Sequence, residues 1–207
     1  MHIKEILIIS LLLMSCTVLY GQKKFKVVEK ETDTWRSIYS LIDEQGKVIR
    51  ELDTAKYYMC FNTDQYVYFG IFGVKGRSGW TAIDADENIL FKIYNTSFGE
   101  PSPDYLVENK IRIVDEQEKI GFANNKGEII IRPQYEMATA FHKGKAIIGE
   151  KCRKVPWGEH EKESGCHHYS IECGKYGYIN EKGKELKMGT FSFEQIMKEI
   201  NWKMPED

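Results

Sequence analysis

Proline, cysteine and histidine are scarce in this chain, which has 207 residues and only 5 of each. The short motifs that build common active sites are missing too. The sequence holds no Gly-x-Ser-x-Gly elbow, no Cys-x-x-Cys pair and no phosphate-binding loop ending in Gly-Lys-Ser or Gly-Lys-Thr. Charge is nearly balanced at −2, which argues against electrostatic binding of nucleic acid or anionic lipid. We therefore expect a protein without catalysis of its own and without a cofactor.

Long apolar runs are also lacking, except at the amino terminus. Residues 1–21 resemble a secretory signal peptide, because the apolar run from Ile6 to Leu19 is too short to be a permanent membrane anchor. Cleavage after Gly21 would release a secreted or periplasmic protein. Cleavage before Cys16 would give an outer-membrane lipoprotein, since Leu-Met-Ser-Cys resembles a bacterial lipobox. Membrane contact is expected only through that possible lipid anchor.

The remaining residues, 22–207, contain short runs of aromatic residues and an internal repeat. Together these features predict a single β domain. A similar ten-residue stretch recurs four times. The first three starts lie about 40 residues apart, and an insertion over 151–173 lengthens the last interval. The copies start near residues 39, 80, 120 and 176, at Tyr39, Trp80, Ile120 and Tyr176.

Each copy is predicted to form a β-hairpin, because an apolar strand runs into Asp or Asn and a polar tip follows. Short Asp and Asn side chains bond to nearby backbone groups and so favour turns. Three of the tips contain glycine, which adopts positive φ without strain. The second copy has Glu87 at that place, so its tip is expected to differ in shape.

Since an isolated hairpin is marginally stable, the copies are expected to stack and share a core. The predicted fold is therefore all-β, an array of antiparallel hairpins that forms an open, solenoid-like sheet or closes like a propeller. After the last copy, residues 191–202 place Phe193, Ile196, Met197 and Ile200 on one helical face. This stretch is expected to be a carboxyl-terminal amphipathic helix that covers an open edge of the array.

The insertion at 151–173 is the stretch richest in reactive side chains. Its thiols and imidazoles suggest three alternatives, which are a disulfide among the cysteines, unpaired thiols, or a metal site that would support a metal-dependent enzyme. A disulfide is favoured, because the close spacing typical of zinc ligands is missing. Cys60 lies far away in an aromatic strand and is expected to be a buried thiol. The disulfide candidates are Cys152, Cys166 and Cys173, and the weak metal candidates are Cys152, Cys166, His167, His168 and Cys173.

The third and fourth copies resemble the WG repeat family of bacterial proteins, whose units run aromatic-Gly-Tyr-Ile-Asp, Gly-Lys, Pro-x-Tyr and Phe-x-x-Gly-x-Ala. The third copy matches most fully, and the first two lack the glycine after the aromatic residue. The resemblance implies a repeat-built β architecture and a role in interaction or scaffolding, with a protein or cell-envelope component as partner and no catalytic residues. The repeat-defining residues are Tyr39, Gly46, Trp80, Gly121, Gly127, Pro133, Tyr135, Phe141, Gly144, Tyr176, Gly177 and Gly183.

Overall fold

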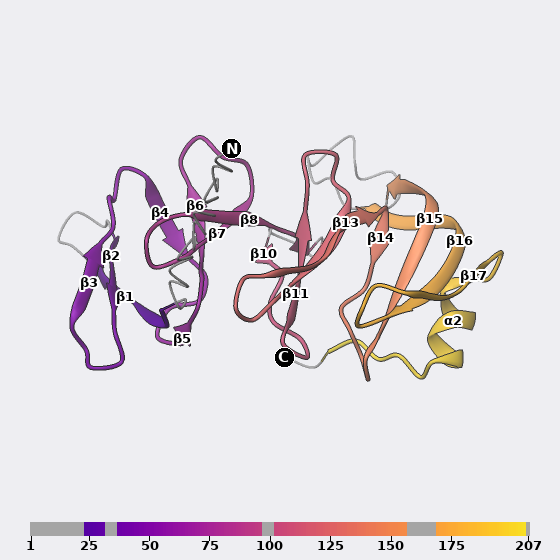
Figure 1. Cartoon of the computed structure of the whole chain (residues 1–207). Coiled ribbons are helices and arrows are strands. Elements are labelled where there is room, and N and C mark those ends of the chain that lie inside the picture. The colour runs from indigo at the N-terminus through magenta and orange to yellow at the C-terminus, as the bar shows by residue number, and fades with distance from the viewer. Residues whose placement is uncertain (1–22, 32–36, 97–101, 157–168, 206–207) are drawn as a thin grey trace, which may run out of the picture.

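The computed structural model describes residues 23–31, 37–96, 102–156 and 169–205 (Figure 1). The expected signal peptide with Cys16, and the insertion residues Cys166, His167 and His168, lie outside these ranges. Within them the chain forms strands β1 to β17 and helix α2. No helix among the described residues is long and apolar enough to cross a membrane.

Four three-stranded antiparallel units make up most of the described chain. Each predicted hairpin is present as the second and third strands of a unit, so the structural repeat is one strand longer than the predicted hairpin. Unit 1 is β1 Phe25–Glu31, β2 Ser37–Ile42 and β3 Val48–Glu51; unit 2 is β6 Gly70–Val74, β7 Trp80–Ile83 and β8 Ile89–Ile93; unit 3 is β11 Lys110–Val114, β12 Ile120–Asn124 and β13 Ile129–Tyr135; unit 4 is β15 Lys145–Pro156, β16 Tyr169–Asn180 and β17 Glu185–Gly189.

The units are assembled into open sheets that follow one another from β3 at one end of Figure 1 to β17 and α2 at the other. Units 2 and 3 share a seven-stranded sheet because β8 pairs with β11, and β4 extends that sheet beyond β6. Units 1 and 4 each form a four-stranded sheet with one short strand. No sheet formed by the described residues closes into a barrel, so the open form of the predicted array is confirmed. The short strands are β4 Tyr57–Cys60, β5 Tyr66–Val67, β9 Asn95–Thr96, β10 Ser102–Pro103 and β14 Met137–Ala138.

The central strands of the four units are equivalent in register. In each unit the residue before the Asp or Asn of the tip pairs with the residue six positions later. The four pairs are Ile42 with Val48, Ile83 with Ile89, Ala123 with Ile129, and Ile179 with Glu185.

The hydrophobic core is divided between successive units, as the array predicts. Units 1 and 2 bury one cluster between them, where Tyr39 packs edge-to-face on Phe72 with ring centroids 5.7 Å apart. Another cluster joins units 3 and 4 and contains Phe122, whose ring centroid lies 4.7 Å from that of Phe141. Units 2 and 3 bury their cluster on the shared sheet. Each unit therefore completes its core with its neighbour.

Helix α2 Phe193–Glu199 covers the carboxyl-terminal end of the array. Ser192 caps it in a capping box with Gln195, and Ile196 is fully buried against unit 4. The helix is shorter than the predicted 191–202. It packs on the face of β15 and β16, while β17 remains the edge strand, so the expected cover of a strand edge was wrong. Burial of the apolar helical face against the face of the sheet decides this position.

The described residues of the insertion, 151–156 and 169–173, form the outer halves of β15 and β16, two paired strands of 12 residues each. Cys152 lies opposite Cys173 in the register and forms a disulfide with it. One of the predicted pairings is thereby confirmed. The disulfide joins the two strands at the margin of the last core cluster, against which Cys173 packs.

Candidate binding surface

The hairpin tips share one hydrogen-bond pattern that depends on a single side-chain oxygen. In the tip of unit 1, Oδ1 of Asp43 accepts the backbone N–H groups of the residues two and four positions later. Asp84, Asn124 and Asn180 do the same in the other units. The tip at Asp115, between β11 and β12, has the same pattern and was missed in the sequence. Side-chain capping therefore sets the tip geometry in all four units.

Glu87 takes the place of glycine in the second tip, and the expectation that this tip differs was wrong. Its φ of 63° is left-handed like the 78° of Gly46, and its N–H bonds to the carbonyl of Asp84 as the N–H of Gly46 bonds to that of Asp43. A left-handed residue other than glycine costs about 1 kcal/mol or more. Because the Asp84 side chain fixes the turn, Glu87 is held in that conformation.

The side chain of Glu87 ties unit 2 to unit 1. Its carboxylate accepts a 2.9 Å hydrogen bond from the Tyr57 hydroxyl and lies 3.3 Å from both Lys56 Nζ and Arg50 Nη1. Partial burial acts to raise the pKa of Glu87, but the hydrogen bonds from Tyr57 and Lys56 outweigh it and the pKa is lowered. The carboxylate is therefore charged at neutral pH and links the two units.

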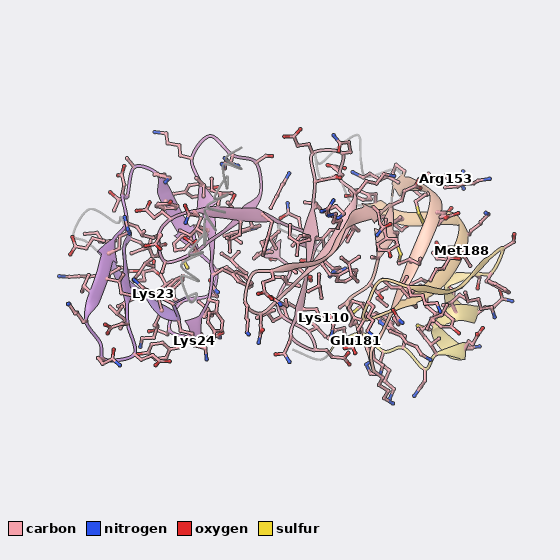
Figure 2. All side chains as sticks on the ribbon, in the orientation of Figure 1. Lys23, Lys24, Lys110, Arg153, Glu181 and Met188 are labelled. Atoms are coloured by element: carbon pink, nitrogen blue, oxygen red, sulfur yellow. A yellow bond between two sulfur atoms is a disulfide. The ribbon has the colours of Figure 1, made fainter. Side chains whose placement is uncertain are left out.

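A matching tie joins units 3 and 4. The hydroxyl of Tyr135 donates a 3.2 Å hydrogen bond to the carbonyl of Gly183, the left-handed residue of the fourth tip. Nearby, the ammonium group of Lys110 lies 2.6 Å from the carboxylate of Glu181, and Figure 2 shows these two side chains close together. The tip of one unit thus rests on the preceding unit at both stacked junctions.

The repeat-defining glycines after the aromatic positions have a backbone role. A Cβ on Gly121 would lie 2.5 Å from the carbonyl oxygen of Ile131, and one on Gly177 would overlap the carbonyl of Lys187. At Gly121 the register shifts by a bulge, whereas Gly177 pairs with Met188 just before the register shift between Tyr178 and Ile179. At both places the third strand lies close against the second. Gly144 instead supplies a left-handed residue in the turn before unit 4, where its N–H donates to Glu108 at 3.0 Å. These glycines therefore determine the fold, and any binding would be through other side chains.

A buried ion pair also stabilises the second half of the array. Arg112 on β11 donates to both carboxylate oxygens of Asp104, at 2.6 and 3.0 Å, and stacks on the ring of Tyr94. Burial acts to lower the pKa of Arg112, but Asp104 raises it by more. Asp104 is only 2% exposed, so its charge is satisfied by the protein and is not available to a ligand.

Several exposed aromatic and apolar side chains lie at the β4 margin of the seven-stranded sheet. Tyr58, Met59 and Phe61 are 58%, 48% and 46% exposed, although they follow the fully buried Tyr57. Tyr58 is the extra residue of a bulge, and its ring lies against Gly73 where any other residue would have a side chain. Phe61 packs edge-to-face on Trp80, with ring centroids 6.0 Å apart.

These side chains share one face of the sheet. Met59 and Trp80 both pair with Gly73, and directly paired residues of antiparallel strands point to the same face. Trp80 is half-buried and packs against the core cluster of units 2 and 3. We call the group Tyr58, Met59, Phe61 and Trp80 the aromatic surface. It continues the core face of the sheet out into solvent.

A basic hairpin tip lies beside the aromatic surface. Residues 75–79 connect β6 to β7, directly after Val74 and directly before Trp80, and carry the exposed Lys75 and Arg77. The side chains of Lys75 and Arg77 make no ion pair with any residue that the structure describes. One end of the aromatic surface is therefore positively charged.

A depression of about 470 Å³ lies on unit 1 near the amino-terminal end of the described chain. It is lined by Lys23, Lys24, Asp43, Tyr68 and neighbouring residues, and Figure 2 shows the two lysines side by side there. Its charges are of both signs, and Lys24 lies over the Tyr68 ring at 5.3 Å. Because acidic, basic and apolar side chains are mixed in its lining, this depression does not indicate one class of ligand.

Of the predicted metal candidates, the structure describes Cys152 and Cys173, and these two are not placed as metal ligands. Cys152 and Cys173 are joined to each other, and a disulfide sulfur is not the thiolate that zinc binds. The other three candidates lie outside the described residues. Cys60 is a half-buried free thiol, whose burial raises its pKa to about 12. Cys60 was predicted to be a buried, unpaired thiol, and in the described part of the chain it forms no disulfide.

The geometry defines an all-β repeat protein, an open array of three-stranded units that share their cores. Residues 120–150, from β12 into β15, match the family model of the WG containing repeat. The resemblance to the WG repeat family is thus confirmed on the copy that carries Gly121, Pro133, Phe141 and Gly144. No curated protein matches the chain.

Proposed function

We propose that this WG-repeat protein is a binding module that holds a partner protein against the aromatic surface. The observation that supports it most is the exposure of Tyr58, Met59 and Phe61 on a face that elsewhere forms core. Exposed contiguous apolar groups on a soluble protein mark interaction sites, and aromatic residues and methionine are enriched in protein interfaces.

The position of this surface in the array also supports binding. At the stacked junctions the neighbouring unit covers the apolar face, and at the carboxyl-terminal end α2 covers it. At the β4 margin no described element covers Tyr58 and Phe61. A partner would complete this face in the way that one unit completes its neighbour.

We propose that the protein has no catalysis of its own. The competing hypothesis, a metal-dependent enzyme centred on the insertion, is weakened because two of its five candidate ligands form the disulfide. We also propose a secreted or periplasmic location, with an outer-membrane lipoprotein anchored at Cys16 as the alternative. A disulfide is compatible with such an oxidising compartment.

Site-specific photo-crosslinking in the native host tests the proposed function. A photoreactive phenylalanine analogue replaces Tyr58 in one variant and Leu186 in a matched control, because Leu186 is 45% exposed on β17 in the last unit. We expect a discrete crosslinked product from position 58 and none from position 186. No product from position 58, or the same products from both positions, contradicts the proposed function.

A further inference from the structure

We infer that the partner presents an acidic segment whose carboxylates meet the basic tip at Lys75 and Arg77 while its apolar side chains cover the aromatic surface. This inference rests on the proposed function and adds the chemistry of the partner. The structure offers the two halves of such a site in one place, since residues 75–79 join the two strands that carry Gly73 and Trp80.

The charges at this tip have no ion-pair partner among the residues that the structure describes. At the unit junctions, by contrast, Lys56 is paired with Glu87 and Lys110 with Glu181. Lys75 and Arg77 are exposed and unpaired among the described residues, and Lys92 on β8 has only the hydroxyl of Ser78 at 3.4 Å. On a chain of net charge −2, this local excess of positive charge would steer and orient an acidic partner.

The partner is expected to lie across the sheet face instead of adding a strand to it. β4 is the last strand of its sheet, but Cys60 on β4 packs against the core cluster that contains Tyr39 of the neighbouring sheet. The neighbouring sheet therefore packs against this strand. The side chains of Tyr58, Met59 and Phe61 remain exposed, so recognition goes through side chains and charge.

A protein fits this surface better than a membrane. Positive charge flanks the aromatic surface at the 75–79 tip only, and each basic residue near an anionic membrane contributes only about 1 kcal/mol. Stable binding to a bilayer takes a larger cluster of cations or a second apolar anchor. A small aromatic surface with carboxylate-binding side chains at one end is typical of an interface with a central apolar patch and a charged rim.

Charge reversal in the crosslinking experiment tests the inference. The variant K75E/R77E is compared, in the background with the photoreactive residue at position 58, with K182E/K184E, which makes the same charge change at the exposed tip of unit 4. We expect the first variant to lower the crosslink yield at least ~5-fold and the control to leave it unchanged. Mass spectrometry of the crosslinked partner peptide is expected to find Asp or Glu residues near the attachment point.

Each other outcome is decisive. An unchanged yield in K75E/R77E, or a partner peptide without carboxylates, overturns the acidic partner and leaves the proposed function intact. No crosslink even with Lys75 and Arg77 in place contradicts the proposed function itself. Purified protein is also spun with phosphatidylethanolamine–phosphatidylglycerol vesicles, and co-sedimentation that K75E/R77E abolishes would overturn a protein partner in favour of a lipid surface.

Discussion

The hydroxyl of Tyr57 lies 2.9 Å from the carboxylate of Glu87, and this contact makes an unfavourable backbone conformation useful. Glycine would be the easier residue at a φ of 63°, but glycine has no side chain with which to reach unit 1. In the fourth tip the left-handed residue is glycine, and its backbone takes the place of the carboxylate as the acceptor. There Gly183 accepts the hydroxyl of Tyr135 with its backbone carbonyl. A tyrosine from outside the hairpin thus holds the tip in both stacked pairs, and Arg50 of unit 1 adds an ion pair to Glu87.

Substitutions of Glu87 separate its two effects. Glu87→Ala keeps the left-handed strain and loses the side-chain ties, so we expect a loss of about 1–2 kcal/mol in the free energy of unfolding. Glu87→Gly loses the same ties but relieves the strain, so we expect a change within about 0.5 kcal/mol. Urea unfolding measures both, and equal destabilisation by the two variants would contradict the assigned strain.

The same carboxylate predicts a pH dependence. Because the native pKa of Glu87 is lowered from 4.5, its contribution to stability is present above about pH 4.5 and is lost as the pH falls through the lowered value. We expect Glu87→Gln to destabilise the protein at pH 7 and to have a smaller effect at pH 3. Thermal unfolding at the two pH values measures this, and an equal effect at both would mean that the charge of Glu87 is not involved.

The glycines predict a ranking of variants. Gly177→Ala would place a Cβ against the backbone of β17, which cannot move without breaking the ladder, so we expect a loss of more than about 2 kcal/mol. Gly46→Ala meets no atom within 4 Å and is disfavoured only by its φ of 78°, which costs about 1 kcal/mol. Chemical denaturation measures the order, and Gly46→Ala as the more damaging change would contradict the close approach of the two strands at Gly177.

Removal of the disulfide is expected to act locally. Replacing Cys152 and Cys173 with serine opens a loop with a sequence separation of 21, and such a change costs about 2–4 kcal/mol. The bridge lies at the margin of the core cluster of unit 4 and touches no cluster of units 1 and 2, so hydrogen exchange is expected to rise in the outer parts of β15 and β16 and to stay unchanged in units 1 and 2. Faster exchange throughout unit 1 would show that the hairpin is part of one cooperative core.

How much the sequence could predict depends on how local each interaction is. The tips at Asp43 and Asn180 were found because Asp or Asn followed by glycine acts over five residues. The first strand of each unit was not assigned to the repeat, because its pairing with the hairpin is known only after the fold is formed. The pair of Arg112 and Asp104 carries no sequence motif, although only eight positions separate the two residues. The exposure of Tyr58 could not be predicted, since it depends on the bulge at β4 and on Gly73.

Affinity for the partner recovered through position 58 tests the central claim most directly. The double variant Y58S/F61S removes two exposed rings that contribute little to the core, so we expect Tm to change by less than about 2 °C. The Kd for that partner is expected to rise ~30-fold or more, as for the loss of an aromatic hot spot of about 2 kcal/mol. An unchanged Kd in a folded Y58S/F61S variant would contradict the claim that the aromatic surface is the binding site.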